Sequence, residues 1–444
     1  MATEAHRLGV AWLDPTSVNP EIFVDRKRDR GKLLYVLEGL VQERKVQATL
    51  GVGGRRGVGK SIFVRWCLRE LANRHRERVI AVTVDMRLVS YAEFLKRFAR
   101  ELAASASEVF NRLLTKAESD PKNAPLPANM VSELKRWVHE LDLLARSDTV
   151  TEGQAQQSAR QYGVAATLKG SLLEVLEASN SFSWQETRQS STTTTRTVQI
   201  TAALVQEAVE LTLEKIYQWS QVMVVVFFDD VDQLNVADLS TAVSNVLKLP
   251  NCVRIVHLRD EAAAGNIRRE ISHATIRLTP MPTQVLCEML DARIAVASAE
   301  DQQRYRSPFV QGIVTRLAAI TGSPLVLLRW LSGFAVADLF REQSDEPPWN
   351  SLESLSLVVA DVLATAADPR LLRRVANAVE KEIYVSADPV EMGQLQARLS
   401  EAEFREAVRL ELIGPMDRDH DGAHYWIDPR LALLHDRVIE ALLA

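Results

Sequence analysis

Residues 54–61 read Gly-Arg-Arg-Gly-Val-Gly-Lys-Ser, a spacing that suits the binding of a phosphate chain. Glycines let a loop wrap an anion closely with its backbone N–H groups pointing inward, and a helix opening at the loop adds its positive dipole end. Lys60 is expected to reach the β- and γ-phosphates, and the Ser61 hydroxyl to ligate Mg²⁺. We therefore expect binding of ATP with Mg²⁺. The residues expected to contact the nucleotide here are Gly54, Gly57, Val58, Gly59, Lys60, Ser61 and Ile62.

A second site follows an unbroken apolar run at 222–228, which ends in Asp229-Asp230-Val231-Asp232. A buried strand that ends in acids places carboxylates at the carboxyl edge of the sheet, where α/β folds bind ligands. Asp229 is expected to hold Mg²⁺, commonly through water. Asp230 occupies the position of a base that orients the attacking water, and we expect it to be catalytic together with Lys60. Asp232 is either an outer ligand or a helix N-cap.

The stretch 23–29 reads Phe-Val-Asp-Arg-Lys-Arg-Asp, some thirty residues before the loop. It resembles the F-[VI]-G-R-x-x-E lead-in of AAA+ and STAND ATPases, which packs beside the nucleotide base. It departs from that pattern at Asp25 and Asp29, and a solvated run of charges is the competing interpretation. The resemblance implies that Arg26 contacts the nucleotide.

Two later motifs are similar to motifs of the same ATPases. Residues 257–260, His-Leu-Arg-Asp, resemble the [ST]-R-[DE] strand ending that senses the γ-phosphate, which implies a sensor at His257 or at Arg259, the latter counted as catalytic. Residues 321–327 look like the G-x-P-L-x-L motif, whose proline touches the adenine, which implies a contact by Pro324. A helix stop and restart at Gly-Ser-Pro explains the same residues.

Arg268 and Arg269 precede a short predicted strand. In AAA+ relatives this region supplies an arginine finger to a neighbouring subunit, whereas a surface charge pair explains the two residues equally well. Motif order over residues 21–340 resembles a P-loop ATPase of the AAA+/STAND type, near the initiator-type (origin-recognition-like) branch. The resemblance implies an ATPase.

The elements that position these motifs alternate between strands and helices. Expected strands are 46–53, 78–85, 222–228, 253–258 and 275–278, and expected helices are 61–74, 91–104 and 202–218. This order builds a parallel sheet with helices on both faces. The predicted fold class is α/β, with a parallel-sheet P-loop NTPase domain over 21–280 and an N-terminal extension at 1–20.

A polar insertion is expected at about 105–200, because the chain loses its aliphatic texture there. Helical pieces near 130–145 precede an alternating stretch and a threonine-rich run. An extended hairpin with a mobile tip around 186–197 and a disordered linker both explain this pattern.

Helical patterns dominate the rest of the chain. Segments 283–298, 308–321 and 325–341 predict a helical lid over 281–346, and the Pro-Pro pair at 347–348 marks a boundary. Helices expected near 351–366, 368–383 and 388–411, closed by short strands at 412–416 and 424–427, predict a winged-helix-like domain over 347–444. Residues 417–428 copy much of an EF-hand calcium loop, but strand-like flanks and an Asp-Gly pair favour a hairpin turn.

The composition is that of a globular protein, with 47% apolar and 25% charged residues and a formal net charge of −5. A net negative charge does not predict that the chain as a whole binds nucleic acid, although a local basic patch remains an alternative. The three cysteines lack paired spacing, so reduced structural thiols are expected. No apolar run reaches the length of a membrane span, and a cytoplasmic protein is expected, with no membrane partner.

Two function classes remain open. One is an ATP-operated molecular switch that acts with a separate effector or sensor protein, for example in a bacterial defence or signalling complex, with nucleotide-dependent homo-oligomerisation. The other is a DNA-dependent ATPase (initiator, loader or transposition regulator) that binds duplex DNA through the C-terminal domain, where helix 369–383 carries Arg370, Arg373, Arg374 and Lys381. A metabolic kinase is disfavoured because the acid pair suits activation of water.

Overall fold

The computed structural model describes residues 26–54, 58–86, 89–151, 154, 171–179, 185–188, 194–229, 231, 244–257, 274–306, 308–339, 368–378, 390–410, 412–415 and 424–443. These residues divide into two compact units, each described by itself. The sheet unit comprises Lys27–Gly53 and Lys60–Leu278. The helical unit comprises Arg26, the loop Gly54–Gly59 and the described residues from Thr279 onward.

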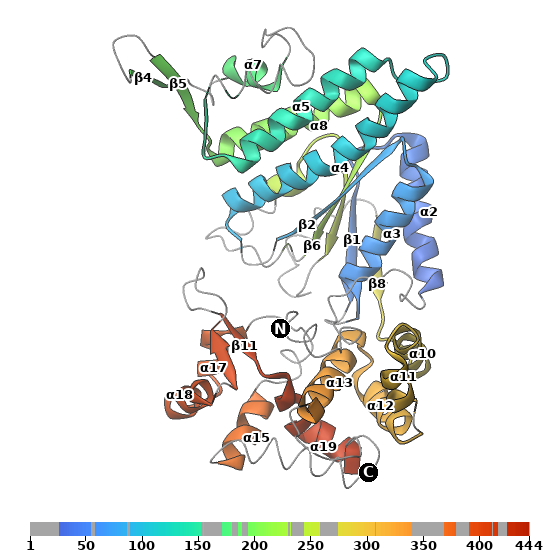
Figure 1. Cartoon of the computed structure of the whole chain (residues 1–444), viewed down its shortest axis with the longest axis vertical. Helices are drawn as coiled ribbons and strands as arrows, with labels where there is room; N and C mark the ends of the chain where they lie inside the picture. The colour runs from blue at the N-terminus through green and yellow to red at the C-terminus, as the bar shows by residue number, and fades with distance from the viewer. Residues whose placement is uncertain are drawn as a thin grey trace. The chain divides into compact units, whose positions relative to one another are not determined.

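A five-stranded sheet forms the centre of the sheet unit, and its strands follow the order β2, β6, β7, β1, β8 (Figure 1). Their bounds are β2 Val79–Asp85, β6 Met223–Asp229, β7 Cys252–His257, β1 Thr49–Gly54 and β8 Ala274–Leu278. The pairs β2–β6, β6–β7 and β7–β1 are parallel. Every residue of β6 and β7 is buried, as expected for strands covered on both faces. The predicted α/β fold class and all five predicted strands are confirmed.

Strand order decides which chain segments meet at the carboxyl edge of this sheet. β7 lies between β1, which leads into the phosphate loop, and β6, which ends in Asp229. On the other side of β6 the register pairs Asp229 with Asp85, the last residue of β2. Because carboxyl ends of parallel strands share one edge, the ends of β2, β6 and β7 converge there.

In the part of the chain that the structure describes, four helices pack against this sheet: α2 (Lys27–Glu43), α3 (Lys60–Arg74), α4 (Tyr91–Ser119) and α8 (Ala202–Ser220). A fifth, α5 (Ala128–Arg146), packs on α4 and α8 (Figure 1). Phe94 and Phe98 of α4 meet Phe228 of β6 edge to face, with ring centroids 6.0 and 5.7 Å apart. This aromatic contact fixes α4 against the strand that carries Asp229. Among the described residues, no helix has both the length and the apolar character needed to cross a membrane.

The helix expected to end near residue 104 continues as α4 to Ser119, so the insertion boundary expected near 105 falls inside one continuous helix. The apolar stripe simply persists, with Ala106, Val109, Phe110 and Leu113 buried at helical spacing. These residues and the apolar face of α5 belong to the same hydrophobic core as β2 and β6. The first part of the expected polar insertion is therefore core structure.

Residues after α5 form a small antiparallel sheet in the order β3 (Thr149–Thr151), β5 (Thr194–Gln199), β4 (Gln185–Arg188). β4 and β5 pair as a hairpin, so of the two interpretations offered for this stretch the hairpin is the one found. Residues 189–193 of its expected tip lie outside the described residues.

A buried acid ties this region to α5. The Glu140 carboxylate accepts hydrogen bonds from the backbone N–H groups of Leu172 and Leu173, 2.7 and 3.3 Å away, at the start of α7 (Leu172–Glu177). Arg136 lies 3.9 Å from its other oxygen. Burial raises the pKa of Glu140 to about 7, although Arg136 and the two N–H groups oppose that shift.

Because the pKa of Glu140 is raised, the stability of the fold is expected to fall as the pH rises. Between pH 4.5 and about 7 the folded chain keeps on Glu140 a proton that the unfolded chain has released. The contribution of Glu140 to the free energy of unfolding is therefore greatest below pH 4.5. It is lost as the pH rises through about 7, which lowers the free energy of unfolding by at most about 3 kcal/mol. Glu140→Gln keeps an acceptor oxygen, so we expect it to flatten this decline. Melting temperatures of both proteins from pH 5 to 8 test this, and parallel profiles would contradict it.

The helical unit contains α10 (Thr283–Ile294), α11 (Ala299–Tyr305), α12 (Pro308–Thr321) and α13 (Pro324–Leu339). Three of these four helices match the expected helices of the lid, and α11 is additional. The chain turns between α12 and α13 at Gly322, whose φ is +57°. There the Gly322 carbonyl accepts a hydrogen bond from Met281 N, 2.9 Å away, which ties the turn to the segment entering α10.

Gly322→Ala is expected to destabilise the helical unit by about 1–2 kcal/mol, because the residue needs a left-handed φ. An added Cβ would also lie 3.0 Å from the Pro280 Cβ. Gly312→Ala within α12 is the matched control, since its Cβ meets nothing within 4 Å. That control should be neutral or stabilising by up to about 1 kcal/mol. Urea denaturation of both variants measures the difference, and equal midpoints would contradict the prediction.

The described C-terminal elements are α15 (Pro369–Ala378), β9 (Val390–Glu391), α17 (Met392–Gln396), α18 (Glu401–Arg409), β10 (Ile413–Pro415), β11 (His424–Ile427), the 3₁₀ helix η7 (Pro429–Leu434) and α19 (Asp436–Leu443). The two predicted short strands, β10 and β11, are confirmed as an antiparallel pair, and β9 joins them. The single helix expected at 388–411 is wrong. Ser400 and Glu403 form a capping box that starts a new helix there.

One hydrophobic core runs through the helical unit. Leu327 and Leu331 of α13 share it with Leu372 of α15 and Leu431 of η7. The boundary expected at 347–348 and the helix expected near 351–366 lie outside the described residues.

Candidate functional site

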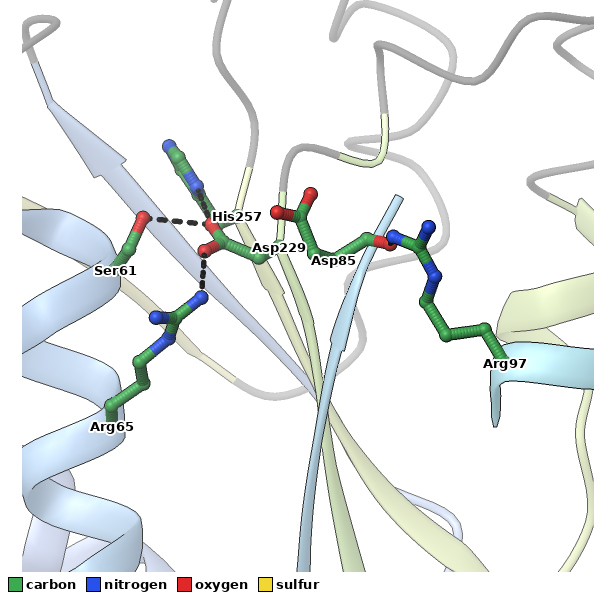
Figure 2. Close-up of polar contacts among 6 residues, drawn as sticks. All are labelled: Ser61, Arg65, Asp85, Arg97, Asp229 and His257. Atoms are coloured by element: carbon green, nitrogen blue, oxygen red, sulfur yellow. Dashed lines mark hydrogen bonds and ion pairs between the residues drawn. The ribbon is translucent and has the colours of Figure 1, made fainter. Parts of the chain in front are cut away.

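Asp229 is the centre of a polar cluster at the carboxyl edge of the sheet (Figure 2). Its side chain comes from the buried end of β6 and is 3% exposed. The Ser61 hydroxyl donates a hydrogen bond to Asp229 Oδ1 at 2.8 Å, and His257 Nδ1 lies 2.5 Å from the same oxygen. Arg65 Nη2 lies 3.3 Å from Oδ2. Three elements, α3, β6 and β7, therefore converge on one carboxylate.

These contacts keep the carboxylate charged. Burial alone would raise the pKa of Asp229, but the hydrogen bonds from His257 and Ser61 and the nearby charge of Arg65 outweigh burial. The pKa is consequently held below its usual range. An ionised carboxylate next to a hydroxyl provides the hard oxygen atoms that a divalent cation prefers.

The phosphate loop has the backbone that its glycines predict. Gly54 and Gly59 have φ values of +135° and +87°, which residues with a side chain rarely adopt. Helix α3 begins at Lys60, so its N-terminal N–H groups open at the end of the loop. Lys60 is 4% exposed and Val58 is fully buried, whereas Ile62 is half-buried. Gly57 lies outside the described residues.

Of the two residues considered as sensors, His257 belongs to the described residues, and it lies at the acidic edge. It ends β7, which lies between β1 and β6, and its ring contacts the carboxylate of Asp229 at the end of β6. Arg259, Asp230, Asp232, Arg268 and Arg269 lie outside the described residues, and their expected roles remain predictions.

Sequence reasoning missed Arg65 and Asp85. Arg65 follows Ser61 by four residues on α3, so both face the same side of the helix, a spacing that would have revealed it. Asp85 ends the apolar strand β2 as Asp229 ends β6, and the two are register partners. Met86 N donates to the Asp229 carbonyl oxygen at 3.0 Å, and Arg97 of α4 donates to the Asp85 carbonyl oxygen at the same distance. Figure 2 shows Arg97 on the opposite side of Asp85 from Asp229.

Arg26 is buried, 8% exposed, and sits at a left-handed φ of +77°. Its Nη2 donates to the Val58 carbonyl oxygen at 2.9 Å and to the Thr279 carbonyl oxygen at 2.8 Å. Within the helical unit, Arg26 thus contacts both the phosphate loop and the segment after β8. Pro324 is buried at the first position of α13, as the helix-restart interpretation requires.

The residues present fit Mg²⁺. Mg²⁺ prefers hard oxygen ligands, often one or two from the protein with the rest from water and substrate phosphates. The Ser61 hydroxyl and Asp229 carboxylate provide two such oxygens within 2.8 Å of each other. Across the part of the chain that the structure describes, no group of three or more His, Cys, Asp and Glu side chains is gathered as a metal site.

Comparison with known proteins finds similarity at the level of solved structures. No family model and no curated protein matches the chain. The chain is similar to the ORC1 protein of Aeropyrum pernix in complex with DNA, with 13% identity, a TM-score of 0.43 and coverage of 97% of this chain and 95% of that one. Drosophila ORC bound to DNA gives 14% identity, a TM-score of 0.43 and coverage of 98% and 90%. Cdc6p from Pyrobaculum aerophilum gives 11% identity, a TM-score of 0.39 and coverage of 98% of this chain and 97% of that one. With TM-scores below 0.5, no site or partner follows from these likenesses.

Proposed function

We propose that this chain is an ATP-binding and hydrolysing molecular switch of the AAA+/STAND type. The observation that carries the proposal is the 2.8 Å hydrogen bond between Ser61, the last residue of the phosphate loop, and Asp229, the acid that ends β6. These residues are 168 positions apart, and the fold brings them together at the carboxyl edge of the sheet, as a loop-and-acid site requires. Buried Lys60 at the start of α3 adds the expected phosphate cation.

The proposed roles follow from these positions. The loop N–H groups and Lys60 bind the β- and γ-phosphates, and Ser61 and Asp229 hold Mg²⁺, with ATP as substrate. When bound, Mg²⁺ neutralises charge on the phosphates. Asp230, next to Asp229, orients the attacking water as a base. His257 or Arg259 senses the γ-phosphate, and Pro324 contacts the base.

The contacts of Asp229 also suggest how occupancy is sensed. Ser61 and His257 approach the same carboxylate oxygen, so a ligand that draws Ser61 away changes the contacts of His257 at the end of β7. A switch needs such a local change that favours one of two arrangements. We propose that a separate effector or sensor protein responds to it, as in a bacterial defence or signalling complex in the cytoplasm. Nucleotide-dependent homo-oligomerisation, with Arg268 or Arg269 as an arginine finger, is part of this proposal.

A DNA-dependent ATPase is the second candidate, and the C-terminal elements favour it. The three-stranded sheet β10-β11-β9 accompanies α15, α17 and α18, a set of elements compatible with a winged helix. Helix α15 carries Arg370, Arg373 and Arg374. However, Arg373 pairs with Asp436 at 2.8 Å and Arg374 with Glu403 at 2.6 Å, so part of this charge is neutralised within the unit. That neutralisation places DNA binding second.

ATP turnover measured with and without duplex DNA across a salt series separates the two candidates. A switch that acts on a protein should give the same turnover in both conditions, whereas a DNA-dependent ATPase should be stimulated at low salt and lose that stimulation as salt rises. Arg370→Gln serves as the matched variant because the DNA candidate predicts weaker stimulation for it. If DNA neither binds nor changes turnover at low salt, the DNA candidate fails. If no ATP is hydrolysed under any condition, the hydrolytic part of both candidates fails.

A further inference from the structure

Arg26 makes contacts that a residue stacked beside a base does not need. One nitrogen, Nη2, donates to two backbone carbonyl oxygens, those of Val58 and Thr279. A guanidinium Nη carries two N–H groups, so both bonds can form at once. Val58 belongs to the phosphate loop, and Thr279 follows β8, 253 positions after Arg26. The bond to the Val58 carbonyl is buried, so water competes weakly for it, whereas the bond to the Thr279 carbonyl is partly buried.

The bond to Val58 determines the direction of the next amide. In a trans peptide the carbonyl C=O and the N–H of the following residue point to opposite sides. Because Arg26 holds the Val58 carbonyl toward itself, the Gly59 N–H points away from Arg26. Gly59 adopts a φ of +87°, at which its own peptide orientation is not set by a side chain. An external contact is therefore needed to fix the orientation of this amide before a phosphate arrives.

The bond to Thr279 anchors the same guanidinium to the entry of the lid helices. The chain runs from Thr279 through Pro280 to Met281, whose N–H donates to the Gly322 carbonyl at the α12–α13 turn. A continuous set of contacts inside the helical unit thus leads from the phosphate loop through Arg26 to the turn before Pro324. A change in the orientation of the Val58 peptide would therefore alter the contacts of Arg26 and, through Thr279, the position of the segment that enters α10.

We infer that Arg26 is a positioning residue for phosphate binding, which aims the Gly59 N–H at the phosphate chain and ties the loop to the lid entry. This inference rests on the proposed function, since it concerns the same phosphate loop. It differs from a base contact because the affected part of the ligand is the phosphate chain. The ligand class is any polyphosphate anion with Mg²⁺, whatever base it carries.

The test compares Arg26→Met, which keeps a long side chain without a donor, with Arg26→Lys, which keeps a cationic donor. Both share the backbone cost of the left-handed φ with the native arginine. Arg28→Met, on the exposed start of α2, is the matched control. The probes are inorganic tripolyphosphate, ATP and GTP, each with Mg²⁺, and the readout is the dissociation constant by calorimetry.

Arg26→Met is expected to raise the dissociation constants of tripolyphosphate and of ATP by the same factor, about tenfold or more. Arg26→Lys should recover part of this loss, and Arg28→Met should bind like the wild type. Undiminished binding of tripolyphosphate by Arg26→Met overturns the inference, and so does a loss confined to the preference for ATP over GTP. If Arg26→Met does not fold, Arg26→Leu, which also lacks a donor, replaces it in the same comparison. A wild-type protein that binds none of the probes refutes the proposed function instead.

Discussion

Replacing Lys60 with alanine is expected to abolish ATP binding, with a loss of affinity of at least about a hundredfold. Lys60 is 4% exposed and is the first residue of α3, directly after the left-handed Gly59. Its ammonium group is the cation that the sequence motif assigns to the β- and γ-phosphates. Without it, the β- and γ-phosphates would lose their proposed lysine partner and would depend on N–H dipoles and Mg²⁺ alone.

Calorimetric titration of Mg·ATP into wild type and Lys60→Ala measures this loss. Lys32→Ala is the matched control, since its side chain is 56% exposed on α2 and lies 3.9 Å from Asp29. That control should bind as the wild type does, because a surface ion pair of this kind contributes little. Near-UV circular dichroism checks that Lys60→Ala is folded. ATP affinity unchanged in a folded Lys60→Ala protein would place the nucleotide elsewhere.

Asp229→Asn is expected to lose the Mg²⁺ dependence of ATP binding, whereas Asp230→Asn is expected to lose most of its hydrolytic activity. The carboxylate of Asp229 accepts from Ser61 and His257 and pairs with Arg65, so an amide there removes the charge that would hold Mg²⁺. The affinity for ATP in Mg²⁺ should then fall to the affinity in EDTA. Asp230→Asn should keep Mg²⁺-dependent ATP binding but slow hydrolysis by roughly a hundredfold to ten-thousandfold, because only the base is lost.

Two measurements on each variant distinguish these outcomes: the dissociation constant of ATP with and without Mg²⁺, and the single-turnover rate of hydrolysis. Glu210→Gln serves as the control, because Glu210 is a half-buried acid on α8 that accepts a hydrogen bond from Gln206. Normal turnover by Asp230→Asn would remove its role as base. A Mg²⁺ dependence in Asp229→Asn equal to that of the wild type would remove the metal site.

Much of the sheet could be predicted because its strands are short and its central strands, β6 and β7, are fully buried. The run ending in Asp229 contains no polar residue that could mark an exposed face, which is typical of a central parallel strand. The same logic predicted that Ser61 and Asp229 meet, since a phosphate loop and an acidic strand end share one edge of such a sheet. The sensor position was narrowed to His257 or Arg259 but could not be decided from spacing alone.

Other features escaped sequence reasoning for identifiable reasons. The loss of aliphatic residues after about residue 105 suggested that α4 ends early, but the buried stripe of the helix continues through Ala106, Val109, Phe110 and Leu113. The break before α18 depends on the local capping box of Ser400 and Glu403, a signal that was present but was outweighed by an overall helical pattern. The contacts of Arg26 join positions 32 and 253 residues away, and no periodicity encodes such pairings.

The C-terminal elements show most clearly which contacts could not be predicted from the sequence. Short strands at 413–415 and 424–427 were foreseen, but the pairing of β11 with β9 needs a partner more than thirty residues away. Arg373 and Arg374 looked like free basic charge in the sequence. In the structure their partners, Asp436 and Glu403, come from other helices of the same unit.

The central claim is that Lys60, Ser61 and Asp229 belong to one Mg²⁺-dependent site for ATP. Calorimetric titration of ATP into the wild-type protein in Mg²⁺ and in EDTA tests it most directly. The proposed site predicts saturable binding of one ATP per chain, tightened by Mg²⁺. Absence of saturable ATP binding in either buffer, or the same affinity with and without Mg²⁺, would contradict it.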